Sequence, residues 1–353
     1  MGVGNLGFIH MFLKFSSLLG FVPFCDANGR PKSLLFNQIL AIIICLITLA
    51  SKLYFDSIKY PNLVEPDLIV KIGCIKDGLL TCTILNGFLS ANVVSVRNYL
   101  QLRYLTNESC KLYCTNTNRL KPFFIIVAYN FYIISLIVYD LYASKNYVEG
   151  IHIFVNIETY LAYMFVLYIL AYFVFIGCTI ENFKKKLDDW SSIYPLNLKE
   201  LQVISSSSQI FCDLINNFTK VYGMQVFLVM MLSLLDILMT INTILSAELQ
   251  DYPKLVEIFV WWTITLFIPG ISAAYLCETI KSNVQDVLDL CSRNIYRYEG
   301  DIQKEFKLLA NQIVLRSPKM SAAGFFVIDH SLLFTLSNML VTYLVVLVQL
   351  THS

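Results

Sequence analysis

Charged side chains are scarce in this sequence of 353 residues. Asp, Glu, Lys and Arg make up 14% of it, whereas an ordinary soluble domain carries about 25%. The net charge is +1, and no run of basic residues interleaved with aromatic residues occurs. A compact soluble domain is therefore a poor fit, and nucleic acid is not an expected partner.

Groups that perform catalysis or hold metals are also few and scattered. The four histidines form no cluster, and the sequence has neither a nucleophile motif nor a glycine-rich phosphate loop. Among the ten cysteines, Cys110 and Cys114 are close enough in sequence to pair or to bind a metal. No histidine lies near them, which favours reduced thiols. We therefore expect no enzymatic activity, no catalytic or metal-binding residue and no cofactor.

Apolar residues, by contrast, make up 57% of the chain and are gathered in long blocks. Blocks of about twenty residues match a hydrocarbon core roughly 30 Å thick. Lys71, Lys76 and Asp77 weaken the second block at its outer end. The sequence predicts an all-α membrane protein with seven transmembrane helices, at about residues 34–53, 70–96, 122–142, 151–178, 223–246, 255–278 and 324–350.

Basic residues indicate how these helices are oriented. With the N-terminus in the cytoplasm, the inner segments carry 20 of the 26 Lys and Arg residues and the outer segments carry three. This excess predicts a cytoplasmic N-terminus and, with seven helices, an extracellular C-terminus. The glycosylation sequons at Asn107 and Asn217 then lie inside and stay unmodified. Residues 1–33 lack an early basic region and a clear cleavage site, and are expected to form a retained interfacial helix.

The inner segments carry apolar residues at helical spacing. Helices with such stripes should bury them against each other. The resulting bundle either joins subunits as an oligomerisation anchor or completes the fold of one chain, and the sequence favours neither. The stripes comprise Phe183, Leu187, Trp190 and Tyr194; Leu201, Ile204, Phe211, Ile215, Phe218 and Tyr222; Val284, Val287, Leu288, Cys291 and Ile295; and Ile302, Phe306, Leu309 and Ile313.

The last predicted span carries a polar stripe, whose members fall within an arc of about 60° on a helix. Lipid would penalise this stripe, so it must face protein or water. Two interpretations stay open: the stripe bonds to a neighbouring helix, or one such helix per subunit lines a pore. In a pore, the apolar break at Val345 and Val346 would suit a gate that closes by dewetting. The stripe consists of Ser331, Thr335, Asn338, Thr342 and Gln349.

The end of this span resembles a known signature. Residues 342–350 read Thr-Tyr-Leu-Val-Val-Leu-Val-Gln-Leu, similar to the Thr-Tyr, five hydrophobic residues and Gln-Phe of insect gustatory receptors. The final Phe of the signature is Leu350 here. Residues 329–334 (Asp-His-Ser-Leu-Leu-Phe) and 15–24 (FSSLLGFVPF) also resemble segments of that family, so the resemblance covers the whole chain.

The resemblance implies a ligand-gated cation channel. Such receptors are similar to odorant receptors in forming tetramers, with the last helix of each subunit around a central pore and intracellular helices forming an anchor. By this resemblance Gln349 and Leu350 map onto the outer constriction, and Thr342 and Tyr343 support it. The expected parts are an N-terminal helix (1–33), six transmembrane helices with a ligand pocket in their outer half (34–278), anchor helices (279–323) and the pore helix (324–353).

The resemblance also places ligand binding between the outer halves of the earlier helices, where aromatic and polar residues suit a small-molecule pocket. Lys76 and Asp77 either contact a ligand or neutralise each other. Glu158 and Asp236 lie deeper, where an unpaired charge is costly, so we expect each to be functional or paired. Trp261 and Trp262 face different sides, so at most one lines the pocket. The candidate ligand-binding residues are Asp77, Tyr132, Asp140, Glu158, Tyr160, Asp236, Trp261 and Trp262; Lys76, Tyr139, Asn156, Tyr163, Thr240, Asn242 and Glu257 share these outer halves.

We therefore expect a gustatory receptor in the plasma membrane of sensory neurons, acting as a non-selective cation channel. A bitter plant compound is favoured over a sugar as the tastant, because no sugar-receptor motif stands out. Further expected partners are the lipid bilayer and gustatory receptor subunits in a homo- or heterotetramer. The alternative is a seven-helix, G-protein-coupled type of chemoreceptor without a pore of its own, which would have an extracellular N-terminus.

Overall fold

The chain is built almost entirely of helices. The computed structural model describes residues 22–23, 34–59, 68–113, 120–144, 151–192, 197–245, 253–316 and 319–351. The elements are α2 (Leu34–Lys59), α3 (Leu68–Leu89), the π-helical turn η2 (Ser90–Val94), α4 (Val96–Tyr113), α5 (Leu120–Ser144), α6 (Ile151–Ser192), α7 (Leu198–Leu245), α8 (Pro253–Arg297), α9 (Asp301–Arg316), β1 (Ser321–Ala322), β2 (Phe326–Val327) and α10 (His330–Thr351).

Local sequence explains where helices begin and end in the predicted inner bundle, which comprises the helical parts of residues 179–222 and 279–316. The side chain of Asn197 accepts the backbone N–H of Lys199 at 3.1 Å, and Glu200 lies in the first turn, so α7 starts with a capped, acidic turn. Gly300 has a φ of 71°, a left-handed conformation that favours glycine, and it allows the sharp turn from α8 into α9. Asp301 opens α9 and pairs with Lys304 at 2.9 Å.

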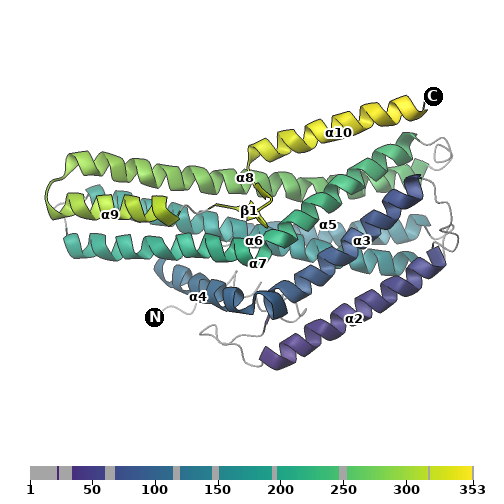
Figure 1. Ribbon diagram of the computed structural model, residues 1–353, viewed down its shortest axis with the longest axis horizontal. Helices are drawn as coiled ribbons and strands as arrows, with labels where there is room; N and C mark the ends of the chain where they lie inside the picture. Colours follow the sequence, from purple (N-terminus) through teal and green to yellow (C-terminus); the bar gives the residue numbers. More distant parts are fainter. Residues whose placement is uncertain are drawn as a thin grey trace.

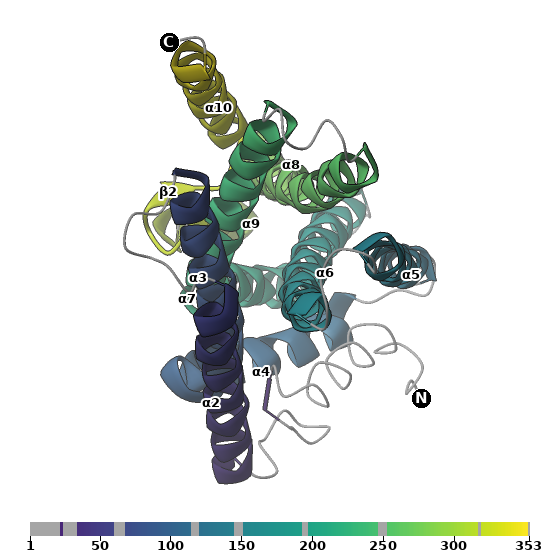
Figure 2. The same cartoon turned by 90° about the vertical axis from the view of Figure 1, so that its right-hand side faces the viewer.

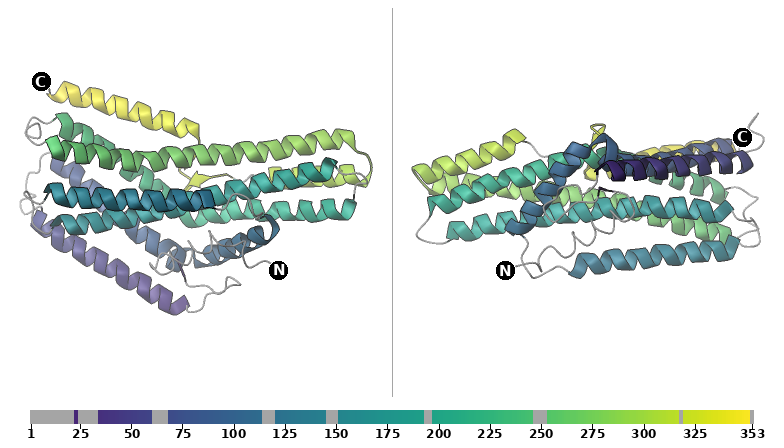
Figure 3. Two further views of the ribbon diagram at one scale, coloured as in Figure 1. Left: turned by 180° about the vertical axis from the view of Figure 1, so that it is seen from behind. Right: turned by 90° about the horizontal axis from the view of Figure 1, so that it is seen from below.

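Three long helices run from the inner bundle into the predicted membrane spans (Figure 1). Helices α6, α7 and α8 have 42, 48 and 45 residues, and α9 packs against α7 and α8 at one end of them. At the other end α2, α3, α5 and α10 join the bundle, as the view from behind also shows (Figure 3). The predicted fourth and sixth spans therefore continue into the inner bundle without a break.

Each of the seven predicted spans coincides largely with a helix: α2, α3, α5, α6, α7, α8 and α10. Within the described part of the chain, four stretches are long and apolar enough to cross a membrane: Gly73–Val94, Glu158–Ser192, Leu198–Ile241 and Val260–Arg297. Large apolar side chains of α2 and α5 are exposed, among them Phe36, Leu46, Phe131 and Val138. Such surfaces suit contact with lipid rather than water.

The predicted burial of the four amphipathic stripes is confirmed. Their members are buried or pack against the core, apart from Tyr194, which lies outside the described residues. Phe183 packs on Phe211 with ring centroids 5.0 Å apart, and Trp190 packs on Phe306 at 5.8 Å. Aromatic pairs of this kind join α6 to α7 and to α9, so the hydrophobic core continues into the inner bundle.

The last predicted span, 324–350, begins too early. Residues 321–327 form a β-hairpin, in which Ser321 lies opposite Val327 and Ala322 opposite Phe326. Ala323 and Gly324 make its turn with positive φ values of 53° and 82°, which a helix does not contain. Helix α10 starts only at His330.

Candidate pore helix and outer binding site

Helix α10 lies at the edge of the bundle (Figures 1 and 2). It contacts α7 and α8 through an apolar face. Leu332 is buried in the core, Leu336 packs against it, and Leu340 lines the narrow space between the three helices. One face of α10 therefore packs against its own chain.

The polar stripe of α10 lies on the opposite, exposed side. The Thr335 hydroxyl donates to the Ser331 carbonyl at 3.0 Å, and the Thr342 hydroxyl donates to the Asn338 carbonyl at 2.8 Å. Each hydroxyl is thus held by its own helix one turn earlier, while its oxygen can still accept a bond from water. All five members are exposed in the single chain: Ser331, Thr335, Asn338, Thr342 and Gln349.

The predicted gate lies at the far end of the same helix. Val345 and Gln349 are exposed, whereas the side chains of Val346 and Leu350 lie outside the described residues. Tyr343, the second residue of the signature, is half-buried, and among the described residues its buried hydroxyl finds no hydrogen-bond partner. Unlike the stripe, this tyrosine turns toward the bundle.

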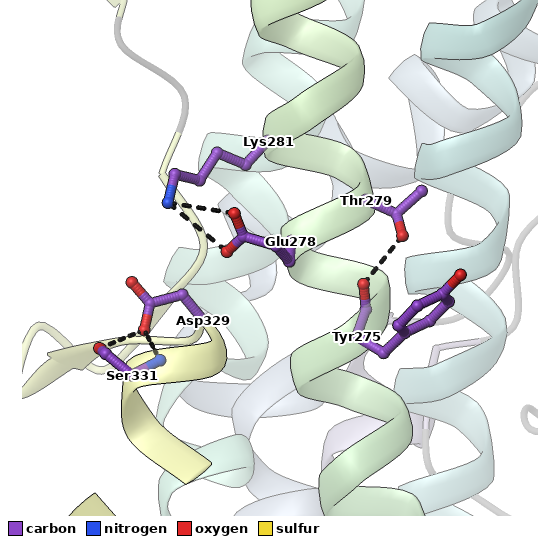
Figure 4. Close-up of polar contacts among 6 residues, drawn as sticks. All are labelled: Tyr275, Glu278, Thr279, Lys281, Asp329 and Ser331. Carbon is purple, nitrogen blue, oxygen red and sulfur yellow. Dashed lines mark hydrogen bonds and ion pairs between the residues drawn. The ribbon is translucent and has the colours of Figure 1, made fainter. Parts of the chain in front are cut away.

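The base of α10 is fixed by a capping aspartate (Figure 4). The Asp329 carboxylate accepts the Ser331 hydroxyl at 2.5 Å and the Ser331 backbone N–H at 3.0 Å. The hydroxyl of Ser331 lowers the pKa of Asp329, and the backbone N–H groups of Leu332 and Ser331 and the charge of nearby Lys281 lower it further. On α8, Lys281 pairs with Glu278 at 3.3 Å. The start of α10 thus carries a negative charge, which also suits the helix dipole.

Two ion pairs join helices in the half of the bundle that is predicted to face outward. Lys76 of α3 pairs with Asp236 of α7, and Lys52 of α2 pairs with Asp77 of α3 at 3.5 Å. Lys76 and Asp77 therefore each bind an oppositely charged residue on another helix. Asp236 is the most deeply placed of these residues, since its side chain is 4% exposed. One of its carboxylate oxygens, Oδ2, has no hydrogen-bond partner among the described residues.

An aromatic and hydroxyl cluster lies near Asp236. The Tyr132 hydroxyl bonds to the Thr265 hydroxyl at 2.9 Å, and Tyr163 stacks on Trp262 with ring centroids 5.7 Å apart. Tyr163 lies within electrostatic range of both Asp236 and Tyr132. The structure therefore brings Tyr132, Tyr163, Asp236 and Trp262 together from α5, α6, α7 and α8.

The other predicted residues differ in exposure and in their hydrogen-bond partners. Trp261 is exposed, while its neighbour Trp262 is half-buried, so the two do face different sides. Asp140 is buried, and Glu158 and Tyr160 are half-buried. Thr240 bonds to Thr263 at 2.5 Å, and Tyr139 donates to Glu257 at 3.2 Å. The side chains of Asn156 and Asn242 lie outside the described residues.

Lys52 is the charged residue that sequence reasoning missed. It lies inside the first predicted span (34–53), where a lysine in an apolar helix requires a partner. The opposite charge of Asp77, in the next span along the chain, could have indicated this partner.

The described residues contain no group of three His, Cys, Asp or Glu side chains that could hold a metal ion. A small apolar cavity of about 20 Å³ lies between α7, α8 and α10, lined by Met230, Ile237, Phe267, Gly270, Leu336 and Leu340. A volume of this size holds little more than one water molecule, so it is not a ligand pocket.

Comparisons with known proteins agree on one family and one fold. A family model described as 7tm Chemosensory receptor matches residues 9–351. The structure of the insect olfactory receptor OR5 from Machilis hrabei superimposes with a TM-score of 0.66 at 14% identity, covering 97% of this chain and 99% of that chain. The same receptor in complex with eugenol gives a TM-score of 0.64 at 12% identity, covering 98% and 99%. No curated protein matches the sequence.

Proposed function

Because this chain belongs to the 7tm chemosensory receptor family, we propose that it is a ligand-gated, non-selective cation channel opened by a small tastant. The chain is a multi-pass membrane receptor with the fold of an insect olfactory receptor, and it is not an enzyme. Beyond the family and the fold, we propose the pore, the tastant and a location in the plasma membrane of sensory neurons. The observation that carries it is the exposed polar stripe on α10.

The geometry of α10 supports a pore shared between subunits. At about 100° per residue, the stripe and the packed face of Leu332, Leu336 and Leu340 point roughly 130° apart. A polar stripe left against lipid would be unfavourable. Four copies around an axis would turn their stripes toward a common water-filled path, with Thr342 and Gln349 near its outer end. Uncharged hydroxyl and amide groups there suit weak selectivity among cations.

The cluster around Asp236 supports binding in the outer half. Tyr132, Tyr163 and Trp262 offer aromatic surface, and Asp236 supplies a buried carboxylate with one oxygen unbonded among the described residues. Apolar walls with few polar groups are typical of small-molecule sites. A receptor with this fold has been solved with eugenol, a small phenol, which favours an aromatic plant compound over a sugar.

Such a ligand opens the channel only if it binds the open arrangement more tightly than the closed one. Binding between α5, α6, α7 and α8 would change how α7 and α8 support α10. The last helices would then splay and admit cations. We also propose a gustatory rather than an olfactory role for this receptor, because residues 342–350 resemble the gustatory receptor signature.

The test is expression in cells that lack other chemoreceptors, with currents recorded while aromatic bitter compounds are applied. We expect cation currents that persist when G proteins are blocked by GDP-β-S in the pipette. Gln349→Ala should change the relative permeability to large organic cations, whereas Ser337→Ala, a polar change on another face of α10, should not. If cysteines placed at positions 338, 342 and 349 are unreachable by aqueous thiol reagents even with agonist present, α10 does not line a pore.

A further inference from the structure

The β-hairpin that joins the anchor helix α9 to α10 is docked on α7. The Thr219 hydroxyl donates to the Lys319 carbonyl at 3.3 Å. Two turns further along α7, the Phe227 ring stacks on Phe325 with centroids 4.8 Å apart and approaches Phe326 at 5.9 Å. The hairpin therefore follows α7 over the whole stretch from Thr219 to Phe227.

Gly223 lies in the middle of this contact. A Cβ atom at this position would lie 2.8 Å from the Ala323 backbone nitrogen and 3.0 Å from the Ser321 carbonyl oxygen. The first distance is shorter than a Cβ atom tolerates and the second is tighter than most Cβ contacts. The obstructing atoms belong to backbone, which cannot rotate away as a side chain can. Any residue larger than glycine at 223 must displace the hairpin from α7.

The rest of α10 is held less firmly than its base. At the base, the hairpin joins the helix to α7, and the Asp329 cap lies beside Lys281 of α8 (Figure 4). Farther along, no described side chain of α10 after Leu332 is buried in the single chain. A helix fixed at one end and open at the other can tilt about the fixed end.

We propose that the hairpin is the pivot of the pore helix, and that Gly223 is a positioning residue that lets the pivot seat on α7. This inference rests on the proposed channel function. The seated hairpin holds α10 in its closed position, and displacement of the hairpin removes an interaction that favours the closed arrangement. Channels with a displaced hairpin then open without ligand more often.

The first test compares Gly223→Ala with Gly177→Ala. A Cβ at position 177 would meet only the Ile280 side chain, at an ordinary 3.8 Å. At equal surface labelling, Gly223→Ala should raise the agonist-independent share of the maximal current by about threefold to tenfold, as expected for losing a contact of the strength of an aromatic pair. Gly177→Ala should leave that share unchanged.

The second test does not depend on overpacking and serves even if Gly223→Ala fails to reach the surface. Phe325→Ala removes the ring that stacks on Phe227, and Phe131→Ala removes a similarly exposed ring from α5; the two side chains are 69% and 67% exposed. Phe325→Ala should raise the agonist-independent share and Phe131→Ala should not.

The outcomes separate the two hypotheses. A rise in either hairpin variant that its control does not share supports the pivot. A wild-type channel that responds to agonist, with hairpin variants that match it or only lose current, refutes the pivot alone. A wild-type chain that reaches the surface and never conducts refutes the channel function and the pivot with it.

Discussion

The Lys76–Asp236 ion pair predicts unequal costs when it is broken from its two sides. The Asp236 side chain is 4% exposed and the Lys76 side chain is 23% exposed. Lys76→Met leaves a buried carboxylate without its cation, which should cost about 3–5 kcal/mol. Asp236→Asn leaves an ammonium that can extend toward the outer surface and still bond to the amide oxygen, so it should cost about 1–3 kcal/mol.

Thermal unfolding of the detergent-solubilised protein, compared at one heating rate, measures this difference. At roughly 2 °C per kcal/mol for a long chain, Lys76→Met should lower the midpoint by roughly 6–10 °C and Asp236→Asn by roughly 2–6 °C. The double variant Lys76→Met/Asp236→Leu should regain most of the loss, because it removes both charges.

Lys281→Met provides a matched control for the loss of a lysine. Lys281 also pairs with a carboxylate, that of Glu278, but its side chain is 65% exposed. Its removal should change stability by less than about 1 kcal/mol. Equal destabilisation by Asp236→Asn and Lys76→Met, or a double variant no more stable than Lys76→Met alone, would contradict this difference in burial.

Four further changes can be measured by the same unfolding assay. Trp190→Ala should cost about 3–5 kcal/mol by opening a cavity in the inner bundle, and a smaller loss than that of Tyr296→Ser would contradict this packing. Tyr296→Ser, at a side chain 92% exposed, should change stability by less than about 0.5 kcal/mol. Gln225→Leu should cost about 1–3 kcal/mol, because the buried Gln225 accepts from Asn86 at 2.8 Å and donates to Thr83 at 2.9 Å; a neutral result would contradict these bonds. Asp329→Asn should cost about 1 kcal/mol at pH 7. Since the pKa of Asp329 is lowered, its stabilisation is present above the ordinary carboxyl range and is lost as the pH falls through the lowered pKa, so wild type and variant should converge only below about pH 4.

Periodicity in the sequence predicted the inner bundle well. Phe183, Phe211, Phe306 and their stripe neighbours lie in one core, because a repeat of three and four residues places apolar groups on one side of a helix wherever that helix goes. The same periodicity could not show that α6 runs unbroken from Ile151 to Ser192. A helix becomes more polar where it leaves the membrane, but its backbone hydrogen bonds continue. A change in hydropathy therefore does not mark the end of a helix.

The sequence showed which predicted spans contain charged residues, but it did not predict the partners of these residues. Lys76 and Asp77 are neighbours in sequence, yet on a helix they point about 100° apart, so each meets a different helix. The pairing with Asp236 joins residues 160 positions apart in the chain, and only the packing of α3 on α7 creates it.

The sequence by itself determined that the chain is a membrane-embedded helical protein with a polar stripe on its last helix, because hydropathy and helical phase are local properties. Which face of α10 meets its own bundle, which charges neutralise each other and where the hairpin seats on Gly223 were decided only by the tertiary structure. Those features depend on the distances between segments remote in sequence, and such distances exist only after the helices have packed.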